Sequence, residues 1–371
     1  MQISTTWLRL CVWLLGLFPA TGHLAAQQFT WTFVDAERDN REIPVDFRHP
    51  VPMMEGTNLV VVGHGFAMQA TDYDDLADAL VADGYVVALL ATESGLAPDH
   101  EDFGLDLAHV AGQTWQTITT GPIAGNIAPV SAIVGHSMGG GAAWIGAATA
   151  VPEVAALVGL APAETNPSAI AAAAAVGVPV LVISGSADAV TPPDEHHLPI
   201  YNGSVLSPCR ALVTLNDGGH CGFADEGTVC EFGELFFNGM DRPTQQAHAF
   251  ALMASWFAMH LDGNDNAWSQ LEDHVANAAD VTMVSDCETV TMASMPGPAP
   301  RQRHLHPNPA THHVVLPSGT NRVLAFDGCG RPVQVHITDG LLNVSNWPPG
   351  LYTIAIEDEQ CWLQNTRLVV N

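Results

Sequence analysis

Lysine is absent from this chain of 371 residues, so all 11 of its basic side chains are arginine. Aspartate and glutamate number 39, and the formal net charge at pH 7 is −28. That charge repels nucleic-acid phosphates and anionic membrane surfaces, which are therefore excluded as partners. Solubility in saline surroundings and a biased genome explain such an acidic composition equally well.

Apolar runs long enough to cross a bilayer are also missing. The run Leu10–Phe18, which follows Arg9, is shorter than the roughly 20 residues that a membrane helix needs. Pro19 and small residues ending at Ala26 complete a pattern typical of a signal peptide, so we expect residues 1–26 to be removed on export. A buried N-terminal helix is the alternative.

The pattern C-x-x-C does not occur, which argues against a zinc site. Disulfides are expected instead, because exported proteins fold in an oxidising compartment. Cys11 leaves with the signal peptide. Local spacing then predicts the pairs among the six other cysteines: Cys221 with Cys230, Cys329 with Cys361, and, by what remains, Cys209 with Cys287.

Apolar runs alternate with helical periodicities along residues 27–290, the expected catalytic domain. Alternation on both sides of Asp39-Asn40 predicts an antiparallel hairpin over residues 28–50, and Thr71 and Asp74 have the spacing of a capping box for a helix that Gly84 ends. Further strands are expected at 59–62, 85–90, 131–134, 154–160, 178–183 and 211–215, and further helices at 99–118, 139–150 and 244–260. This order predicts an α/β domain with a mostly parallel sheet, helices on both faces, and ligands at the carboxyl ends of the strands.

A Pro-rich linker, residues 291–303, is expected next. From residue 304 to 371 the apolar runs are short and β-like, at 314–316, 323–326, 333–337 and 351–356. These residues predict a second, small, all-β sandwich-like domain.

Ser137 is the centre of a G-x-S-x-G motif, Gly135-His136-Ser137-Met138-Gly139, between a predicted strand and a predicted helix. A strained turn that exposes a nucleophilic hydroxyl needs flanking residues without side chains. A Gly-rich turn without chemistry is the alternative. A serine nucleophile also needs a histidine base and a carboxylate that orients it, and in this kind of fold the acid precedes the histidine.

Asp188 and His220 satisfy that order, and each follows a predicted strand, so they fall at the same edge as Ser137. Asp194 and Asp217 are rival carboxylates. Asp188 is preferred because the following Val190-Thr191-Pro192-Pro193 fixes a turn that holds it. We therefore expect a triad of Ser137, Asp188 and His220.

Two backbone amides are expected to stabilise the oxyanion of the reaction. One is that of Met138, directly after the nucleophile, and the other is that of Phe66, on the loop Gly63-His64-Gly65-Phe66. A tight turn is the alternative role of His64-Gly65. His64 and His136 are expected to be structural.

With these motifs, residues 28–265 resemble α/β-hydrolases of the group that contains bacterial cutinases and polyester hydrolases, dienelactone hydrolases and platelet-activating-factor acetylhydrolases. The polyester-hydrolase branch is matched by Gly135–Gly141, Asp188–Pro192, Leu198–Tyr201 and Gly218–His220. The resemblance implies ester hydrolysis through an acyl-enzyme without metal or cofactor. It also implies Phe66 and Met138 as oxyanion donors and Phe66 and Val190 as walls of the acyl pocket.

One position departs from that branch. A tryptophan usually follows Ala161-Pro162 there, whereas this chain has Ala163. A short aliphatic or small soluble ester is affected less by this change than an aromatic polyester. The short segment between Leu160 and Asp188 further predicts an open cleft without a lid.

The tail resembles the C-terminal (Por) sorting domain of type IX secretion, in His306–Ala310 and Trp347–Tyr352. The usual lysine-rich ending is replaced by Arg367–Asn371. The resemblance implies export through the type IX machinery and removal of the tail outside the cell.

The sequence therefore predicts a secreted, monomeric serine ester hydrolase that acts on short or medium acyl esters or on polyesters. Three alternatives stay open: a platelet-activating-factor acetylhydrolase-like lipase or small-ester esterase, a peptidase or acyltransferase with the same triad, and a secreted binding module that lacks the chemistry.

Overall fold

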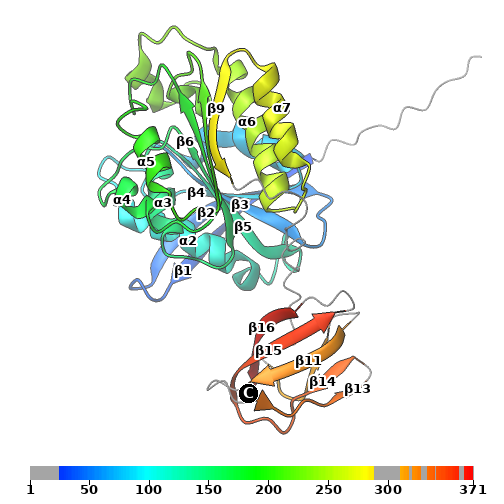
Figure 1. Cartoon of the computed structure of the whole chain (residues 1–371). Helices are drawn as coiled ribbons and strands as arrows, with labels where there is room; N and C mark the ends of the chain where they lie inside the picture. Colours follow the sequence, from blue (N-terminus) through cyan, green and yellow to red (C-terminus); the bar gives the residue numbers. More distant parts are fainter. Residues whose placement is uncertain are drawn as a thin grey trace, which may run out of the picture. The chain divides into compact units, whose positions relative to one another are not determined.

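The computed structural model describes residues 25–287, 310–316, 320–326, 332–338, 340–358 and 363–370. They belong to two compact units that divide after Glu288 (Figure 1). Most of the expected signal peptide and all of the expected linker lie outside the described residues. Among the residues described, no helix is both long and apolar enough to cross a bilayer.

A nine-stranded sheet forms the centre of the first unit, in the order β1-β2-β4-β3-β5-β6-β7-β8-β9. The strands from β3 to β8 run parallel, while β1, β2 and β9 are antiparallel to their neighbours at the two edges. Their bounds are β1 Ala25–Asp35, β2 Arg41–Val51, β3 Thr57–Gly63, β4 Val86–Leu90, β5 Ile127–His136, β6 Val154–Leu160, β7 Val180–Gly185, β8 Cys209–Leu215 and β9 Val281–Cys287.

Helices cover both faces of this sheet (Figure 1). They are α1 Asp74–Ala82, α2 His100–Thr117, α3 Met138–Ala147, α4 Ala169–Ala173, α5 His197–Gly203, α6 Arg242–His260 and α7 Ala267–Asn277, with short 3-10 helices η1 Ala70–Tyr73, η2 Cys221–Phe223 and η3 Val229–Glu234. The core on one face contains Val60 and Val62 of β3 packed with α1, α6 and α7. Leu59 and Val61 point into the other core, with α2 to α5. Because successive strand residues point to opposite faces, β3 is apolar throughout.

The predicted α/β class and the predicted hairpin are confirmed by this arrangement. The short helices α4 and α5 and the weakly alternating edge strand β9 were not predicted. Helix α7 was also not predicted, although Ala267, Leu271 and Val275 recur at helical spacing. The predicted capping box was wrong in its register. Gln69 and Asp72 form it at the start of η1, and Thr71 lies inside that turn.

Two of the three predicted disulfides are confirmed. Cys221 is bonded to Cys230, and Cys209 is bonded to Cys287, which joins β8 to β9. The third predicted pair, Cys329 with Cys361, lies outside the described residues.

The second unit is small and all-β. Its strands form one sheet in the order β10-β14-β13 and another in the order β12-β11-β15-β16, all antiparallel. Their bounds are β10 His313–Val315, β11 Thr320–Phe326, β12 Pro332–Val333, β13 Ile337–Thr338, β14 Leu341–Asn343, β15 Gly350–Asp358 and β16 Leu363–Val370. A separate apolar core includes Trp347, Tyr352 and Ile354.

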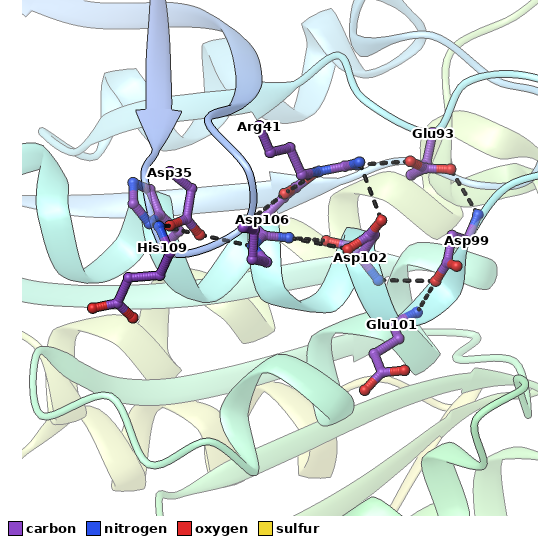
Figure 2. A network of polar contacts seen from close by, with 10 residues as sticks. Asp35, Arg41, Glu93, Asp99, Glu101, Asp102, Asp106 and His109 are labelled. Carbon is purple, nitrogen blue, oxygen red and sulfur yellow. Dashed lines mark hydrogen bonds and ion pairs between the residues drawn. The ribbon is translucent and has the colours of Figure 1, made fainter.

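An ion network joins the β1–β2 hairpin to α2 (Figure 2). Asp106 of α2 is fully buried and lies 2.6 Å from Arg38 and 2.8 Å from Arg41. Arg41 also lies 2.7 Å from Glu93 and 3.2 Å from Asp102. The two guanidinium groups compensate the buried charge of Asp106, so the network fixes the edge hairpin against the helix.

We expect Asp106→Asn to lower the free energy of unfolding by about 3 kcal/mol, because it breaks a buried charge pair. Asp102→Asn is the matched control on the same helix, and since that carboxylate is 39% exposed its loss should stay below about 1 kcal/mol. Urea unfolding of the three proteins measures both values. Equal losses in the two variants would contradict a special role of the buried carboxylate.

Candidate active site

The backbone at Ser137 is in an unusual conformation, with φ 53° and ψ −119°, between the end of β5 and the start of α3. This left-handed region is costly for a residue with a side chain. The neighbours explain how it is tolerated. A Cβ on Gly135 would lie 2.1 Å from the Gly139 oxygen, and one on Gly139 would lie 2.4 Å from the Gly63 oxygen. The turn therefore requires the glycines of the motif.

The structure brings the three predicted triad residues together. His220 Nε2 lies 2.9 Å from Ser137 Oγ, and His220 Nδ1 lies 2.7 Å from Asp188 Oδ2. Ser137, Asp188 and His220 are each at most 8% exposed. Ser137 follows β5, and Asp188 and His220 follow β7 and β8, so all three reach the carboxyl edge of the same parallel part of the sheet.

The Asp188 carboxylate is held by donors of its own loop. Its Oδ1 accepts hydrogen bonds from the amides of Val190 and Thr191, and its Oδ2 accepts one from the Thr191 hydroxyl. Burial acts to raise the pKa of Asp188, but the hydrogen bond and charge of His220 outweigh it and hold that pKa below its ordinary value. The rivals Asp194 and Asp217 are both exposed, and within residues 25–287 neither bonds to His220.

The loop that carries His220 is tied at several points that sequence reasoning missed. The Glu234 carboxylate accepts hydrogen bonds from the amides of His220 and Cys221. Gln245 of α6 makes a reciprocal pair with the backbone of Gly219. The Cys221–Cys230 disulfide closes the same loop. Glu234 and Gln245 carry no motif, so only the folded chain identifies them.

His136 links the nucleophile turn to this loop, in keeping with the structural role expected of it. Its Nε2 donates to the His220 carbonyl, and its Nδ1 accepts from the Tyr73 hydroxyl, which itself accepts from the Gly65 amide. Burial, helped by the nearby His220, lowers the pKa of His136 to about 3, so the ring is neutral. His64 is also buried, and its ring nitrogens contact the carbonyls of Gly65 and Thr92.

The expected oxyanion donors lie on segments that the structure brings into contact. The Gly139 amide donates to the His64 carbonyl, which joins the first turn of α3 to the loop that carries Phe66. Within residues 25–287, no protein group accepts a hydrogen bond from the amide of Phe66 or of Met138. The start of α3 adds the positive end of a helix dipole. These groups suit a developing negative charge beside Ser137.

The residues expected to contact substrate are accessible at this edge. The side chain of Phe66 is 50% exposed and that of Val190 is 40% exposed. Ala163 is half-buried, and its amide donates to the Ser137 carbonyl over 2.8 Å, so position 163 is directly beside the nucleophile turn. Among the residues described, no cluster of three or more His, Cys, Asp or Glu side chains could hold a metal ion.

A family model described as PETase, PET hydrolase-like, matches residues 48–247, a span that contains Ser137, Asp188 and His220. The match covers more than half of the chain. The chain belongs to the PET hydrolase-like family. The family assignment agrees with the observed sheet, and the predicted α/β-hydrolase fold is confirmed.

This PET hydrolase-like chain is also similar to the bis(hydroxyethyl) terephthalate hydrolase of Streptomyces coelicolor. The two are 30% identical over 175 residues, which are 46% of this chain and 53% of the relative. The chain therefore spans about half the length of the curated relative that it matches.

Buried neutral histidines make the first unit sensitive to acid. Burial lowers the pKa of His136 to about 3 and those of His197 and His260 to about 4. Since these values lie below the unfolded value of about 6.5, the unfolded chain binds protons first as the pH falls, and stability declines from about pH 6.5 toward the folded values. Each histidine contributes up to about 1.4 kcal/mol per pH unit to that loss.

We expect the free energy of unfolding to be lower near pH 4.5 than near pH 7.5. His260 lies outside the site, and His260→Phe should reduce this difference in free energy by about 2 kcal/mol. Urea unfolding at the two pH values measures it. An identical pH dependence in wild type and His260→Phe would contradict this account.

Proposed function

We propose that this protein is a secreted serine carboxylic-ester hydrolase of the cutinase and polyester-hydrolase type. The observation that carries the proposal is the continuous contact from Ser137 Oγ through His220 to Asp188, at 2.9 and 2.7 Å. The strain at Ser137 supports it further. A module that only binds ligands has no need of a left-handed serine opposite a buried histidine.

In the proposed mechanism Ser137 Oγ attacks the ester carbonyl carbon while His220 Nε2 takes the hydroxyl proton. Asp188 accepts the Nδ1 hydrogen bond and stabilises the imidazolium. The amides of Phe66 and Met138 bind the oxyanion of the tetrahedral intermediate. His220 then gives its proton to the departing alcohol, which leaves an acyl-enzyme. Water attacks that ester by the same steps and releases the acid.

Apolar side chains near the site support a hydrophobic ester or polyester as substrate. Phe66 and Val190 are exposed, and Val190 packs close to Gly233 in the loop that follows His220. The same loop carries the exposed side chains of Phe232, Leu235 and Phe236, with Phe236 97% exposed. We refer to the segment that carries Phe232, Leu235 and Phe236 as the apolar loop. Exposed apolar side chains gathered beside a site indicate a surface that contacts an apolar partner.

The aromatic or aliphatic nature of the ester depends on Ala163. The name of the Streptomyces relative favours an aromatic ester. The small side chain at position 163, beside the nucleophile turn, offers no ring for stacking and favours a small-ester or aliphatic substrate instead. A panel of esters with graded acyl length, together with aromatic and aliphatic polyester films, distinguishes a preference for aromatic esters from a preference for small or aliphatic esters.

Secretion is proposed on the signal peptide of residues 1–26 and on a C-terminal sorting domain for the type IX machinery, residues 304–371. The disulfides Cys209–Cys287 and Cys221–Cys230 support export, because disulfides form and persist in oxidising compartments.

Ser137→Ala should lower kcat on p-nitrophenyl butyrate by at least about 10³-fold, because it removes the nucleophile of a cooperative triad. Thermal unfolding serves as the control for folding. Full activity of Ser137→Ala would exclude the proposed mechanism, and faster cleavage of the matching anilide than of the ester would favour a peptidase.

Replacing both Phe232 and Phe236 by serine should weaken adsorption to a polyester film about tenfold. Turnover of p-nitrophenyl butyrate should stay within about twofold, because this small ester does not contact the apolar loop, whereas a film does. Leu206→Ser is the matched control, because Leu206 is 63% exposed and precedes β8 at the opposite edge of the sheet. A similar loss of adsorption in Leu206→Ser would show that the apolar loop has no special role.

A further inference from the structure

A chain of buried hydroxyl and imidazole groups contacts Asp188, the acid of the proposed triad. Ser184 Oγ at the end of β7 lies 2.7 Å from His197 Nδ1, at the start of α5. His197 Nε2 lies 3.0 Å from Thr191 Oγ1, which lies 2.8 Å from Asp188 Oδ2. Ser184, Thr191 and His197 are each at most 4% exposed.

Hydrogen-bonding chemistry gives this chain a direction. The Thr191 hydroxyl has a single proton, and its neighbours Asp188 Oδ2 and the Ala161 carbonyl, at 3.3 Å, can only accept. The carboxylate is the nearer and the charged acceptor, so it takes that proton. His197 Nε2 must then donate to Thr191. Its Nδ1 consequently accepts the proton of Ser184, which contacts no other hydrogen-bonding side chain in the described part of the chain.

The opposite tautomer of His197 is incompatible with this direction of hydrogen bonding. If Nδ1 donated to Ser184, Nε2 would need the Thr191 proton, and Asp188 would lose its hydroxyl donor. Burial lowers the pKa of His197 to about 4 even though Asp188 acts to raise it, so the ring holds one proton at neutral pH. The position of that proton therefore sets where the Thr191 hydroxyl points.

We propose that His197 and Thr191 are positioning residues of the triad: His197, anchored by Ser184, directs the Thr191 hydroxyl onto Asp188 Oδ2. This inference rests on the proposed ester hydrolase function and deepens it. The Thr191 oxygen also lies 2.9 Å from His220 Nδ1, so the hydroxyl stands where the acid and the base of the triad meet.

The consequence is control of the charge that Asp188 presents to His220. A charge-assisted hydrogen bond from Thr191 withdraws part of that charge, which limits how strongly the imidazolium of His220 is stabilised. The other titratable groups near this cluster are histidines and Glu234, whose carboxylate accepts a hydrogen bond from the His220 amide. His196 and His220 face His197, and His136 packs against His220.

Thr191→Val removes the hydroxyl and keeps the shape of the side chain. It leaves His220 as the one side-chain donor to Asp188 Oδ2 in the described residues, so the imidazolium is stabilised more. We expect the acid limb of the kcat/KM profile on p-nitrophenyl butyrate to move upward by about half a pH unit or more. Thr191→Ser, which retains the hydroxyl, should keep the wild-type limb.

Two replacements of His197 separate its two contacts. Gln reaches the position of Nε2 and keeps a donor toward Thr191, whereas Asn reaches only the position of Nδ1 and keeps the contact with Ser184. We expect His197→Gln to keep the wild-type limb and His197→Asn to shift it in the same direction as Thr191→Val. Because His197 acts through Thr191, adding His197→Asn to Thr191→Val should change neither kcat nor the limb further.

All variants are made in the full chain, and thermal unfolding identifies those that fold. His197→Gln and His197→Asn both introduce a polar side chain, so their comparison decides the question even where Thr191→Val fails to fold. An unchanged acid limb in His197→Asn, equal behaviour of the Gln and Asn variants, or full additivity with Thr191→Val would overturn the inference. Loss of the proposed function is a different result, because wild type itself would then hydrolyse no ester.

Discussion

A left-handed backbone at Ser137 is the constraint on which the rest of the site depends. It brings the serine hydroxyl to the edge of the sheet and directs the first amide of α3 toward the space beside it. The conformation is compatible with close packing only because Gly135 and Gly139 have no Cβ, and because the loop after β3 lies against Gly139. His136, fully buried, connects this turn to the carbonyl of His220. The proposed nucleophile, base and oxyanion donors are thus parts of one packed unit, and under the proposed mechanism the backbone strain pre-organises the site.

The arginines of the first unit have a different role from the groups of the triad. Each of the five arginines in residues 25–287 is paired with a carboxylate, and the most buried of those carboxylates, Asp106, is held by two of them. The arginines of this unit therefore serve internal contacts, and the excess acidic charge of the chain is uncompensated. Around the Asp188 carboxylate, His136 and His197 are neutral and Thr191 and Ser184 carry hydroxyls, so the positions of their protons shape the electrostatics at the triad.

Local patterns were enough to predict eight of the nine strands of the large sheet, the turn at Ser137 and the residues that meet at it. Buried strands have continuous apolar sequences, and the parallel topology brings the residues after β5, β7 and β8 to one edge. What the sequence could not disclose are contacts between side chains on unrelated segments. Glu234 is 14 residues from His220, and Ser184, Thr191 and His197 meet only after β7 and α5 have packed. The edge strand β9 was missed because only its first residue is buried, so its sequence carries little alternation.

The central claim is that Ser137 carries the acyl group during turnover. The most direct measurement is the site of covalent modification when the full chain reacts with a fluorophosphonate, mapped by peptide mass spectrometry in wild type and in His220→Ala. The account predicts a single adduct on Ser137 in wild type, formed at least about 10³-fold more slowly in His220→Ala because the base is missing. An adduct at another residue, no adduct at all, or equal rates in the two proteins would contradict it.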